Sequence, residues 1–463
     1  MSNDKTVLVV GGGPAGSTTA ALLARAGLRV RLFERATFPR YHIGESLAPS
    51  CRAILELSGA ETKVAAHGFQ LKRGGLFRWG AEDWAVDWEA NLGPHVYSWQ
   101  VERSQFDQLL LEHARDQGVE VIEGAAVKSV RFDGDRATGI EWTHHDASTS
   151  TVTSGDFVVD ASGRTALLAT RHYRDRQAHE VFRNVALWGY WEGATTLPGT
   201  PEGGLDAVSA PDGWYWVIPL ADNRFSVGYV THRDNFRARR PGYKTLEHML
   251  VDLVQESDTV CGLVEQGRLL PPVRCDQDWS YTTGRFAGPG HIMIGDAACF
   301  LDPLLSTGTH LAMFSALIGA AAVTATLDEV VGEAEALQFF ERQYRRSYQR
   351  LLKLVSLMYQ QYQGKETYFW LAQRLVRDGV RYRLPIGPFS RIISGLSDLQ
   401  DAGYSPGWAG LNRNNTVAEP DSAGPVLRGL HDCGSGLRLV TAPRIGLERV
   451  DSAASSDRIR VNH

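Results

Sequence analysis

The chain has 463 residues, of which 43% are hydrophobic and 22% charged, and its formal net charge is −5. This composition is typical of a soluble protein of roughly two or three domains, and the mild acidity argues against a nucleic-acid surface. The five cysteines are widely spaced without a C-x-x-C pair, which argues against a zinc site or a disulfide framework and favours a cytoplasmic location. No run is expected to reach the ~18 apolar residues of a membrane span. A glycine loop interrupts the apolar N-terminus too early for a signal peptide.

The N-terminus carries a strand, a glycine-rich turn and a helix in the order of a dinucleotide-binding unit. Residues 5–10 (KTVLVV) predict a buried parallel strand, and residues 11–16 (GGGPAG) match the pattern G-x-G-x-x-G. A helix of small residues then ends at Gly27, and a second strand over 28–33 is closed by Glu34. Because the acid follows the glycines by about twenty residues, this context favours a bound dinucleotide over a glycine-rich turn without one.

The residues of this fingerprint have distinct physical tasks. Gly11 permits the tight turn, Gly13 lets a pyrophosphate approach the backbone, and Gly16 lets the helix pack closely on the strand. Glu34 is expected to accept hydrogen bonds from ribose hydroxyls.

Two segments further along the chain add candidate polar groups. Residues 67–80 contain an isolated Lys72 between an apolar pair and two glycines, for which a solvated surface lysine is the alternative interpretation. Residues 97–110 predict a strand that leads into an amphipathic helix, with Gln100 and Arg103 near the junction. Both residues are candidates for holding the cofactor, and a charge at a helix start is the alternative.

The middle of the chain reads as sheet. Residues 119–132 and 137–143 predict a hairpin, and 157–163 (FVVDASG) predict a buried strand. The turn after Asp160 is made of small residues and permits close approach to a nucleotide. Residues 181–230 alternate aromatic and polar side chains, which predicts a second, antiparallel region.

A second strand–turn–helix lies at 291–313. The strand over 291–294 (HIMI) is ended by Asp296, and the turn Ser306-Thr307-Gly308 opens an apolar helix. The first N–H groups of a helix have no partner within it, and the helix dipole is positive there. This helix start therefore suits a phosphate or a small anion.

The C-terminal third changes in character. Residues from 331 predict a long covering helix with a solvated face, and 364–383 predict another helix. From residue 400 on, Gly, Pro, Ser and Asn become frequent, so loops or weak order are expected there. The last dozen residues are expected to fray.

Four motifs together point to one family. The glycine fingerprint at 11–16, GES at 44–46, DASG at 160–163 and GDAACFLDPLLSTG at 295–308 resemble the FAD-binding fold of aromatic hydroxylases and flavin-dependent halogenases. The resemblance covers roughly residues 1–385. It implies an α/β fold with an FAD-binding Rossmann-like domain of the aromatic hydroxylase type, an antiparallel β-sheet substrate domain and a mostly helical C-terminal region. The expected domains are 1–77, 97–180 and 265–330 for FAD, 78–96 and 181–264 for substrate, and 331–463 for the C-terminal region with its irregular tail.

Two features favour the halogenases within this group. Residues 214–219 (WYWVIP) fit the halogenase signature W-x-W-x-I-P, and Lys72 stands in the position of the family's catalytic lysine. On a strand, Trp214 and Trp216 point to the same face. In the family such a pair forms a wall that keeps the substrate away from the flavin, and two ordinary core tryptophans are the alternative.

The resemblance implies a mechanism. A separate reductase supplies FADH2, which reacts with O2 to give a C4a-hydroperoxide, and chloride or bromide attacks it to give hypohalous acid. Backbone N–H groups at Thr307 and Gly308 are expected to hold the halide. The oxidant then reaches Lys72, which hydrogen-bonds it or forms a chloramine. The residues implied to bind the cofactor are Gly11, Gly13, Pro14, Ala15, Gly16, Glu34, Arg35, Glu45, Ser46, Gln100, Arg103, Asp160, Gly295, Asp296, Pro303 and Gly308.

One departure narrows the expected substrate. Tryptophan halogenases carry an acid just before the S-T-G turn, where this chain has Leu305. The chain is therefore more similar to halogenases that act on pyrrole or phenol rings in antibiotic or other natural-product biosynthesis. In those enzymes the ring is often presented as a thioester on a carrier protein.

Several points stay open from the sequence. A flavin hydroxylase or flavin reductase on the same scaffold is the main alternative function, and a non-catalytic binding protein is a more distant one. Candidates for the general base are His67, Glu45 and Glu102. Asp276 and Asp278 are candidates for approaching the flavin, even covalently.

Overall fold

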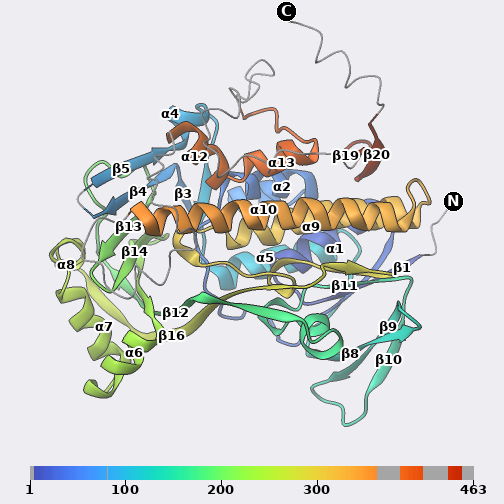
Figure 1. Cartoon of the computed structure of the whole chain (residues 1–463), viewed down its shortest axis with the longest axis horizontal. Helices are drawn as coiled ribbons and strands as arrows, with labels where there is room; N and C mark the ends of the chain where they lie inside the picture. Colours follow the sequence, from blue (N-terminus) through green and yellow to red (C-terminus); the bar gives the residue numbers. More distant parts are fainter. Residues whose placement is uncertain (1–4, 81, 362–385, 410–435, 451–463) are drawn as a thin grey trace, which may run out of the picture.

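The computed structural model describes residues 5–80, 82–361, 386–409 and 436–450, and one half is built on a six-stranded sheet (Figure 1). Its order is β17-β18-β11-β1-β2-β7, and all pairs are parallel except β17 with β18. The strands are β1 (Thr6–Val10), β2 (Arg29–Phe33), β7 (Glu120–Ile122), β11 (Phe157–Asp160), β17 (Ala287–Gly288) and β18 (His291–Met293). The predicted strands at 5–10, 28–33 and 157–160 are confirmed. Their apolar runs fit a sheet that is buried on both faces.

Helices cover this sheet and form a continuous core with it. Helix α1 (Pro14–Arg25) packs against both α5 (Arg103–Asp116) and α9 (Gly308–Leu327). Helix α9 is long and apolar enough, by length and composition, to span a membrane, but 89% of its most apolar window is buried inside the protein. The prediction that no run reaches that length is corrected for α9, whose burial is that of a core helix. Helices α2 (Pro49–Ser58) and α3 (Glu61–Ala66) follow one another on the same side.

A seven-stranded sheet forms the other half, with the order β16-β12-β15-β14-β13-β4-β5. All its pairs are antiparallel except β13 with β4, which confirms the predicted antiparallel region. The strands are β4 (Gly74–Trp79), β5 (Glu82–Asp87), β12 (Arg176–Glu192), β13 (Leu205–Ala210), β14 (Gly213–Pro219), β15 (Arg224–His232) and β16 (Arg268–Thr283). Its far face packs on α6 (Arg233–Arg239), α7 (Leu246–Gln255) and α8 (Asp258–Val264).

Smaller units complete the fold. The predicted hairpin is confirmed by β8 (Ala125–Asp133) and β9 (Arg136–His144), to which β10 (Thr151–Ser154) adds a third strand. In Figure 1 this small sheet and helices α6 to α8 lie at opposite ends of the molecule. The short strands β3 (Gln70–Lys72) and β6 (Ser98–Gln100) pair with one another, and α4 (Trp88–Leu92) follows β5.

The C-terminal region differs from its prediction. Helix α10 (Glu333–Gln361) runs across the molecule in front of α9 (Figure 1), and one of its faces is buried in the core. Residues beyond 400 were expected to be irregular, but β19 (Leu437–Val440) and β20 (Gly446–Arg449) form a hairpin that packs on α9. Helices α12 (Ile386–Ile393) and α13 (Leu396–Ala402) precede it. The helix predicted over 364–383 and the fraying of the last dozen residues lie outside the described residues.

Strand pairing does not follow the predicted domain boundaries. The boundary after residue 77 falls inside β4, and the boundary after residue 180 falls inside β12. Strand β16 was assigned to the FAD-binding domain, but it pairs along β12 in the seven-stranded sheet. The physical reason is that long strands continue through a boundary that composition alone places at a change of pattern.

Candidate active site

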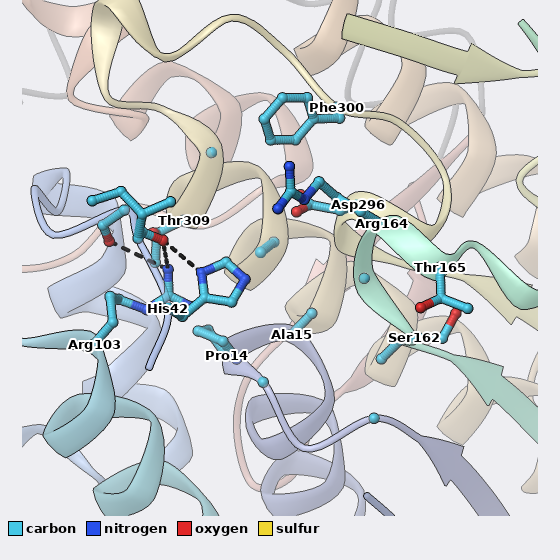
Figure 2. A pocket seen from close by; sticks show the side chains of 18 of the residues that line it. Pro14, Ala15, His42, Arg103, Ser162, Arg164, Thr165, Asp296, Phe300 and Thr309 are labelled. Carbon is cyan, nitrogen blue, oxygen red and sulfur yellow. Dashed lines mark hydrogen bonds between the residues drawn. The ribbon is translucent and has the colours of Figure 1, made fainter. Parts of the chain in front are cut away.

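A cavity of about 900 Å³ lies between the two sheets and collects most of the residues that the sequence singled out. Figure 2 shows Pro14 and Ala15 at its base, His42 and Arg103 on one flank, and Arg164 and Asp296 on the other. The predicted cofactor residues on its wall are Gly11, Gly13, Pro14, Ala15, Glu34, Arg35, Glu45, Ser46, Arg103, Asp296, Pro303 and Gly308. They come from segments that are far apart in the sequence and meet only in the folded chain.

The glycine turn makes one end of this cavity suitable for a pyrophosphate. Gly11 has a φ of +105°, and a Cβ there would lie 2.3 Å from the carbonyl oxygen of Ala161, so only glycine fits. A Cβ at Gly13 would meet only the Arg40 Nη2 atom, at 3.3 Å, which leaves room for a ligand. Helix α1 starts at Pro14 without a side-chain cap. Its first N–H groups are therefore available to an anion.

The carboxylate of Glu34 stands where a ribose is expected. It is 5% exposed and lines the cavity. Its Oε2 accepts a hydrogen bond from the N–H of Gly12 at 2.6 Å, and its Oε1 accepts one from Ala36 at 2.8 Å. These two bonds fix the carboxylate, and each oxygen keeps a second lone pair for a ribose hydroxyl. The residues at this end therefore fit the adenosine part of FAD.

Four of the predicted cofactor residues do not line the cavity, because they are used to build its frame. A Cβ at Gly16 would lie 1.9 Å from the carbonyl oxygen of Gly11, so Gly16 serves close packing of α1. Asp160 accepts hydrogen bonds from two backbone N–H groups of its own turn. The amide of Gln100 donates to the carbonyl of Gly203 at 3.0 Å, and the carbonyl of Gly295 accepts from Tyr344. Each of the four therefore has a supporting role in the structure, and direct cofactor contact by them stays a prediction.

Charged groups flank the cavity in pairs. Arg103 is fixed by Asp107, with 2.7 Å from its Nε to a carboxylate oxygen, and it also donates to the carbonyls of Ile43 and Gly44. On the other flank, burial raises the pKa of Asp296 to about 6, and nearby arginines act in the opposite direction. The Asp276 singled out from the sequence lines the cavity and pairs with Arg164.

Two indoles of β14 form part of the cavity wall together with a third that sequence reasoning missed. The ring centroids of Trp214 and Trp216 lie 6.1 Å apart, and Trp188 on β12 lies 6.2 Å from Trp216. The predicted shared face of Trp214 and Trp216 is confirmed, since Tyr215 between them packs into the opposite core. Gly228 pairs with both Trp188 and Trp216, and a Cβ there would lie 2.2 Å from the Trp216 ring. A glycine inside a strand pattern is the signal that could have indicated this close packing.

The indole wall is held from behind by α10. The N–H of Trp214 donates to the Tyr359 hydroxyl at 2.9 Å, and that hydroxyl donates to Asp302, 3.0 Å from the Oδ2 atom. Asp302 in turn accepts from Asn184 and from the N–H of Leu304. This network ties the tryptophan motif to the turn that precedes α9. Sequence reasoning missed Tyr359, because it treated α10 as a covering helix.

Lys72 is buried and lies outside the lining of the large cavity. Its side chain is 3% exposed, and its Nζ donates to the Ser46 hydroxyl at 2.7 Å and to the carbonyl of Leu47 at 3.0 Å. Desolvation by burial lowers the pKa of Lys72 to about 7. The face of the Trp88 ring, 4.7 Å from Nζ, favours the charged form. A surface lysine, the alternative interpretation, is excluded.

A second, small cavity of about 20 Å³ contains Lys72 and adjoins the large one. Leu205 and Ser306 line both cavities. The other residues around the amine are mainly apolar or glycine: Ala48, Gly74, Gly75, Phe77, Val86, Trp88, Leu305 and Ile393. The flavin-sized cavity and the cavity around the amine therefore share two wall residues.

The turn before α9 offers a place for a small anion. Helix α9 begins at Gly308, and Thr307 at its N-cap makes no side-chain capping bond. The Thr307 hydroxyl is buried and has no hydrogen-bond partner among the described residues. Gly308 lines the large cavity, and a Cβ there would meet no atom within 4 Å. Thr307 itself lines neither cavity, so the halide contact assigned to it stays a prediction.

The three candidates for the general base differ in their position relative to the cavities. His67 is exposed and bonds to Gln105, and Glu102 pairs with Arg224. Neither lines either of the two cavities, whereas Glu45 lines the large one.

The fold and the site define an FAD-binding oxidoreductase with a second, lysine-containing chamber. The family model described as tryptophan halogenase matches residues 6–93 and 85–380. A tryptophan 2-halogenase of Chondromyces crocatus is 42% identical over 408 residues, which cover 87% of this chain and 78% of that protein. A sulochrin halogenase of Aspergillus terreus is 34% identical over 386 residues, covering 78% and 70%. The solved structure of a myxobacterial chondrochloren halogenase superposes with a TM-score of 0.76 at 34% identity, covering 86% and 91%.

The chain therefore belongs to the flavin-dependent tryptophan halogenase family. It is an oxidoreductase enzyme that uses FAD, a halide and O2.

Proposed function

We propose that the chain chlorinates or brominates an electron-rich ring, a phenol or a pyrrole, and that Lys72 delivers the halogen to it. The observation that carries this proposal is the amine itself: it is buried, its pKa is lowered to about 7, and it lines a small cavity that shares Leu205 and Ser306 with the flavin-sized cavity. An amine near neutrality is available in both protonation states. Arginine could not replace it, because guanidinium does not lose its proton.

The residues divide the reaction between the two chambers. Bound FAD, in its reduced form, supplies with O2 the oxidising power that turns halide into hypohalous acid. The start of α9 at Thr307 and Gly308 holds the halide, and the indoles of Trp214 and Trp216 keep the ring substrate out of the flavin chamber. The oxidant passes between Leu205 and Ser306.

Lys72 then places the halogen. As an ammonium group it donates a hydrogen bond to hypohalous acid beside the ring. As a neutral amine it forms a chloramine and water, and the N–Cl bond breaks when the ring takes the chlorine and returns its proton to the nitrogen. Both routes need the amine within reach of the ring.

Leu305 favours a substrate ring that reacts with electrophilic halogen without help from a second charged group. Leu305 lines the lysine cavity. In the sequence it occupies the position, just before the S-T-G turn, at which tryptophan halogenases carry an acid. A phenol or pyrrole needs less help from a second charged group than an unfavoured carbon of indole. Free tryptophan is the competing substrate, and the 42% identical tryptophan 2-halogenase favours it.

We propose that the ring is presented as a thioester on a carrier protein in natural-product biosynthesis. A separate flavin reductase in the cytoplasm is proposed to supply the reduced cofactor. Mass spectrometry of phenols, pyrroles and tryptophan, free and carrier-bound, after incubation with reduced FAD, O2 and halide tests the proposal. A halogenated phenol or pyrrole supports it, and halogenated free tryptophan as the main product contradicts it. A hydroxylated product without halide dependence would favour the hydroxylase alternative.

A further inference from the structure

A buried carboxyl group on the wall of the large cavity has an oxygen without a partner. Glu45 is 3% exposed and lines the cavity. Its Oε1 accepts a hydrogen bond from the Tyr190 hydroxyl at 2.6 Å. Its Oε2 is buried and has no hydrogen-bond partner among the described residues. A buried polar atom left unpaired is costly, so such an atom calls for an explanation.

A row of hydroxyl groups leads from Glu45 to the surface. The hydroxyls of Tyr190 and Tyr41 are 3.1 Å apart, and the indole N–H of Trp188 donates to the Tyr41 oxygen at 2.7 Å. Because Tyr190 donates to Glu45, the proton between the two hydroxyls comes from Tyr41. Every bond of the row therefore donates towards Glu45. Tyr41 is 43% exposed and also lines the large cavity, so this residue at the outer end of the row is open to solvent.

Burial favours a protonated carboxyl group at the inner end of the row. It raises the pKa of Glu45, while the Tyr190 hydrogen bond, the nearby Ser226 hydroxyl and the charges of Arg103 and Arg224 act in the opposite direction. Burial also raises the pKa of Tyr190 and of Tyr41. The Arg274 guanidinium lies over the Tyr41 ring, 3.9 Å from its centroid. Neither tyrosine is expected to hold a negative charge. A proton would have to move along the row in concert.

We propose that Tyr41, Tyr190 and Glu45 form a proton relay from solvent into the flavin cavity. The reduced cofactor supplies two electrons and two protons. Converting chloride and O2 with these into hypochlorous acid and water consumes one further proton. In the relay, the O–H bond at Glu45 Oε2 breaks and releases that proton into the cavity. Oε1 then takes the proton of Tyr190, Tyr190 takes that of Tyr41, and Tyr41 takes one from water.

The relay concerns formation of the oxidant and is independent of the ring substrate and of Lys72. Its test is therefore made without an aryl substrate, using chemically reduced FAD, O2 and chloride, with a dimedone-type trap for hypochlorous acid. Three variants are compared over a pH series: E45Q, which keeps the hydrogen-bond acceptor but has no transferable proton, Y190F, which interrupts the row, and the control Y243F. Tyr243 packs against the far core and lines no part of the cavity.

We expect E45Q and Y190F to form trapped hypochlorous acid roughly 100-fold more slowly, the scale of a lost general acid, and Y243F to match the parent. The parent rate should fall as the pH rises through the pKa of Glu45, and E45Q should not show this fall. Infrared spectra of the FAD-free proteins give a second readout: the protonated carboxyl band should be lost in E45Q and kept in Y190F. A Y190F rate equal to the parent at all pH values would overturn the relay, as would a parent spectrum without that band.

Discussion

The two chambers differ in size and in the groups that line them. The flavin-sized chamber has a volume of about 900 Å³ and carries arginines, carboxylates and helix starts. The lysine chamber has about 20 Å³ and is lined mainly by apolar side chains and glycines around one amine. The first is built to bind a large, charged cofactor and a halide. The second can hold a ring only if its side chains move apart.

This difference explains why one polar group suffices in the lysine chamber. The apolar walls remove water from Lys72 and lower its pKa, which is what makes an ordinary amine reactive near neutral pH. In the flavin chamber the same apolar walls would leave the phosphates without partners. The two proposed steps therefore match two different surroundings, which share Leu205 and Ser306 in their walls.

Removing the amine should separate the chambers most sharply. Lys72→Ala is expected to lower ring halogenation by roughly 10³-fold, within the range for a lost catalytic group, while flavin oxidation continues. Lys72→Arg should be nearly as inactive. Product mass spectrometry and flavin absorbance measure the two rates. Lys63→Ala, at an exposed ion pair with Asp116, is the control, and full halogenation by Lys72→Ala would show that the lysine assignment is wrong.

The burial of Lys72 also predicts a pH dependence of stability. Its pKa is about 7 in the folded chain, against 10.5 for an ordinary unburied lysine, so between these values the unfolded chain binds more protons. Stability should therefore rise from about pH 7 to about pH 10.5. Lys72→Met should lack this rise. Urea unfolding of both proteins over this range checks it, and equal slopes would mean that the amine is not desolvated.

Disrupting the hydrogen bonds around Asp398, which hold the start of α9, should affect both chambers together. Asp398 accepts from His310 at 2.8 Å and from Arg350 at 2.8 Å, and His310 also bonds to Ser50. Asp398→Ala removes a buried carboxylate that pairs with Arg350 and accepts from His310, while Asp401 still pairs with Arg350, and it should cost about 3–5 kcal/mol of unfolding free energy. Denaturant unfolding measures this loss, and exposed Asp116→Ala should lose far less. An unchanged midpoint for Asp398→Ala would mean that α13 does not support the start of α9.

A change confined to the flavin chamber should weaken the cofactor and leave the fold intact. At Gly13 a valine has room in the empty cavity, since only Arg40 lies nearby, but it occupies the space expected for the pyrophosphate. Gly13→Val should weaken FAD binding by about 1–3 kcal/mol, or roughly 5- to 150-fold. Fluorescence titration with FAD measures it. Gly242→Val, at an open position, is the control, and unchanged FAD affinity in Gly13→Val would contradict the placement of the cofactor.

The smallest expected effect concerns the hydrogen bond that joins the chambers. Ser46→Ala removes the acceptor 2.7 Å from Lys72 Nζ, a bond worth about 0.5–1.5 kcal/mol. Halogenation should fall by up to about tenfold, while trapped hypohalous acid stays constant. A fall of both rates in parallel would place Ser46 in the flavin step instead.

The sequence by itself determined the local units. The glycine fingerprint, the strands around it and the start of α9 were predictable, because apolar periodicity and glycine positions act over a few residues. The W-x-W-x-I-P motif likewise fixed the shared face of Trp214 and Trp216, since side chains alternate along a strand. Lys72 could be singled out only through the family resemblance.

Only the tertiary structure decided what surrounds these units. Tyr359 comes from a stretch predicted as a covering helix, and Asp398 from a stretch for which no element was predicted, yet they hold the indole wall and the start of α9. Glu45 and Tyr190 are far apart in the sequence and meet across two elements. The lowered pKa of Lys72 comes from side chains of several distant segments. Burial and long-range hydrogen bonds arise from packing, and no local pattern encodes them.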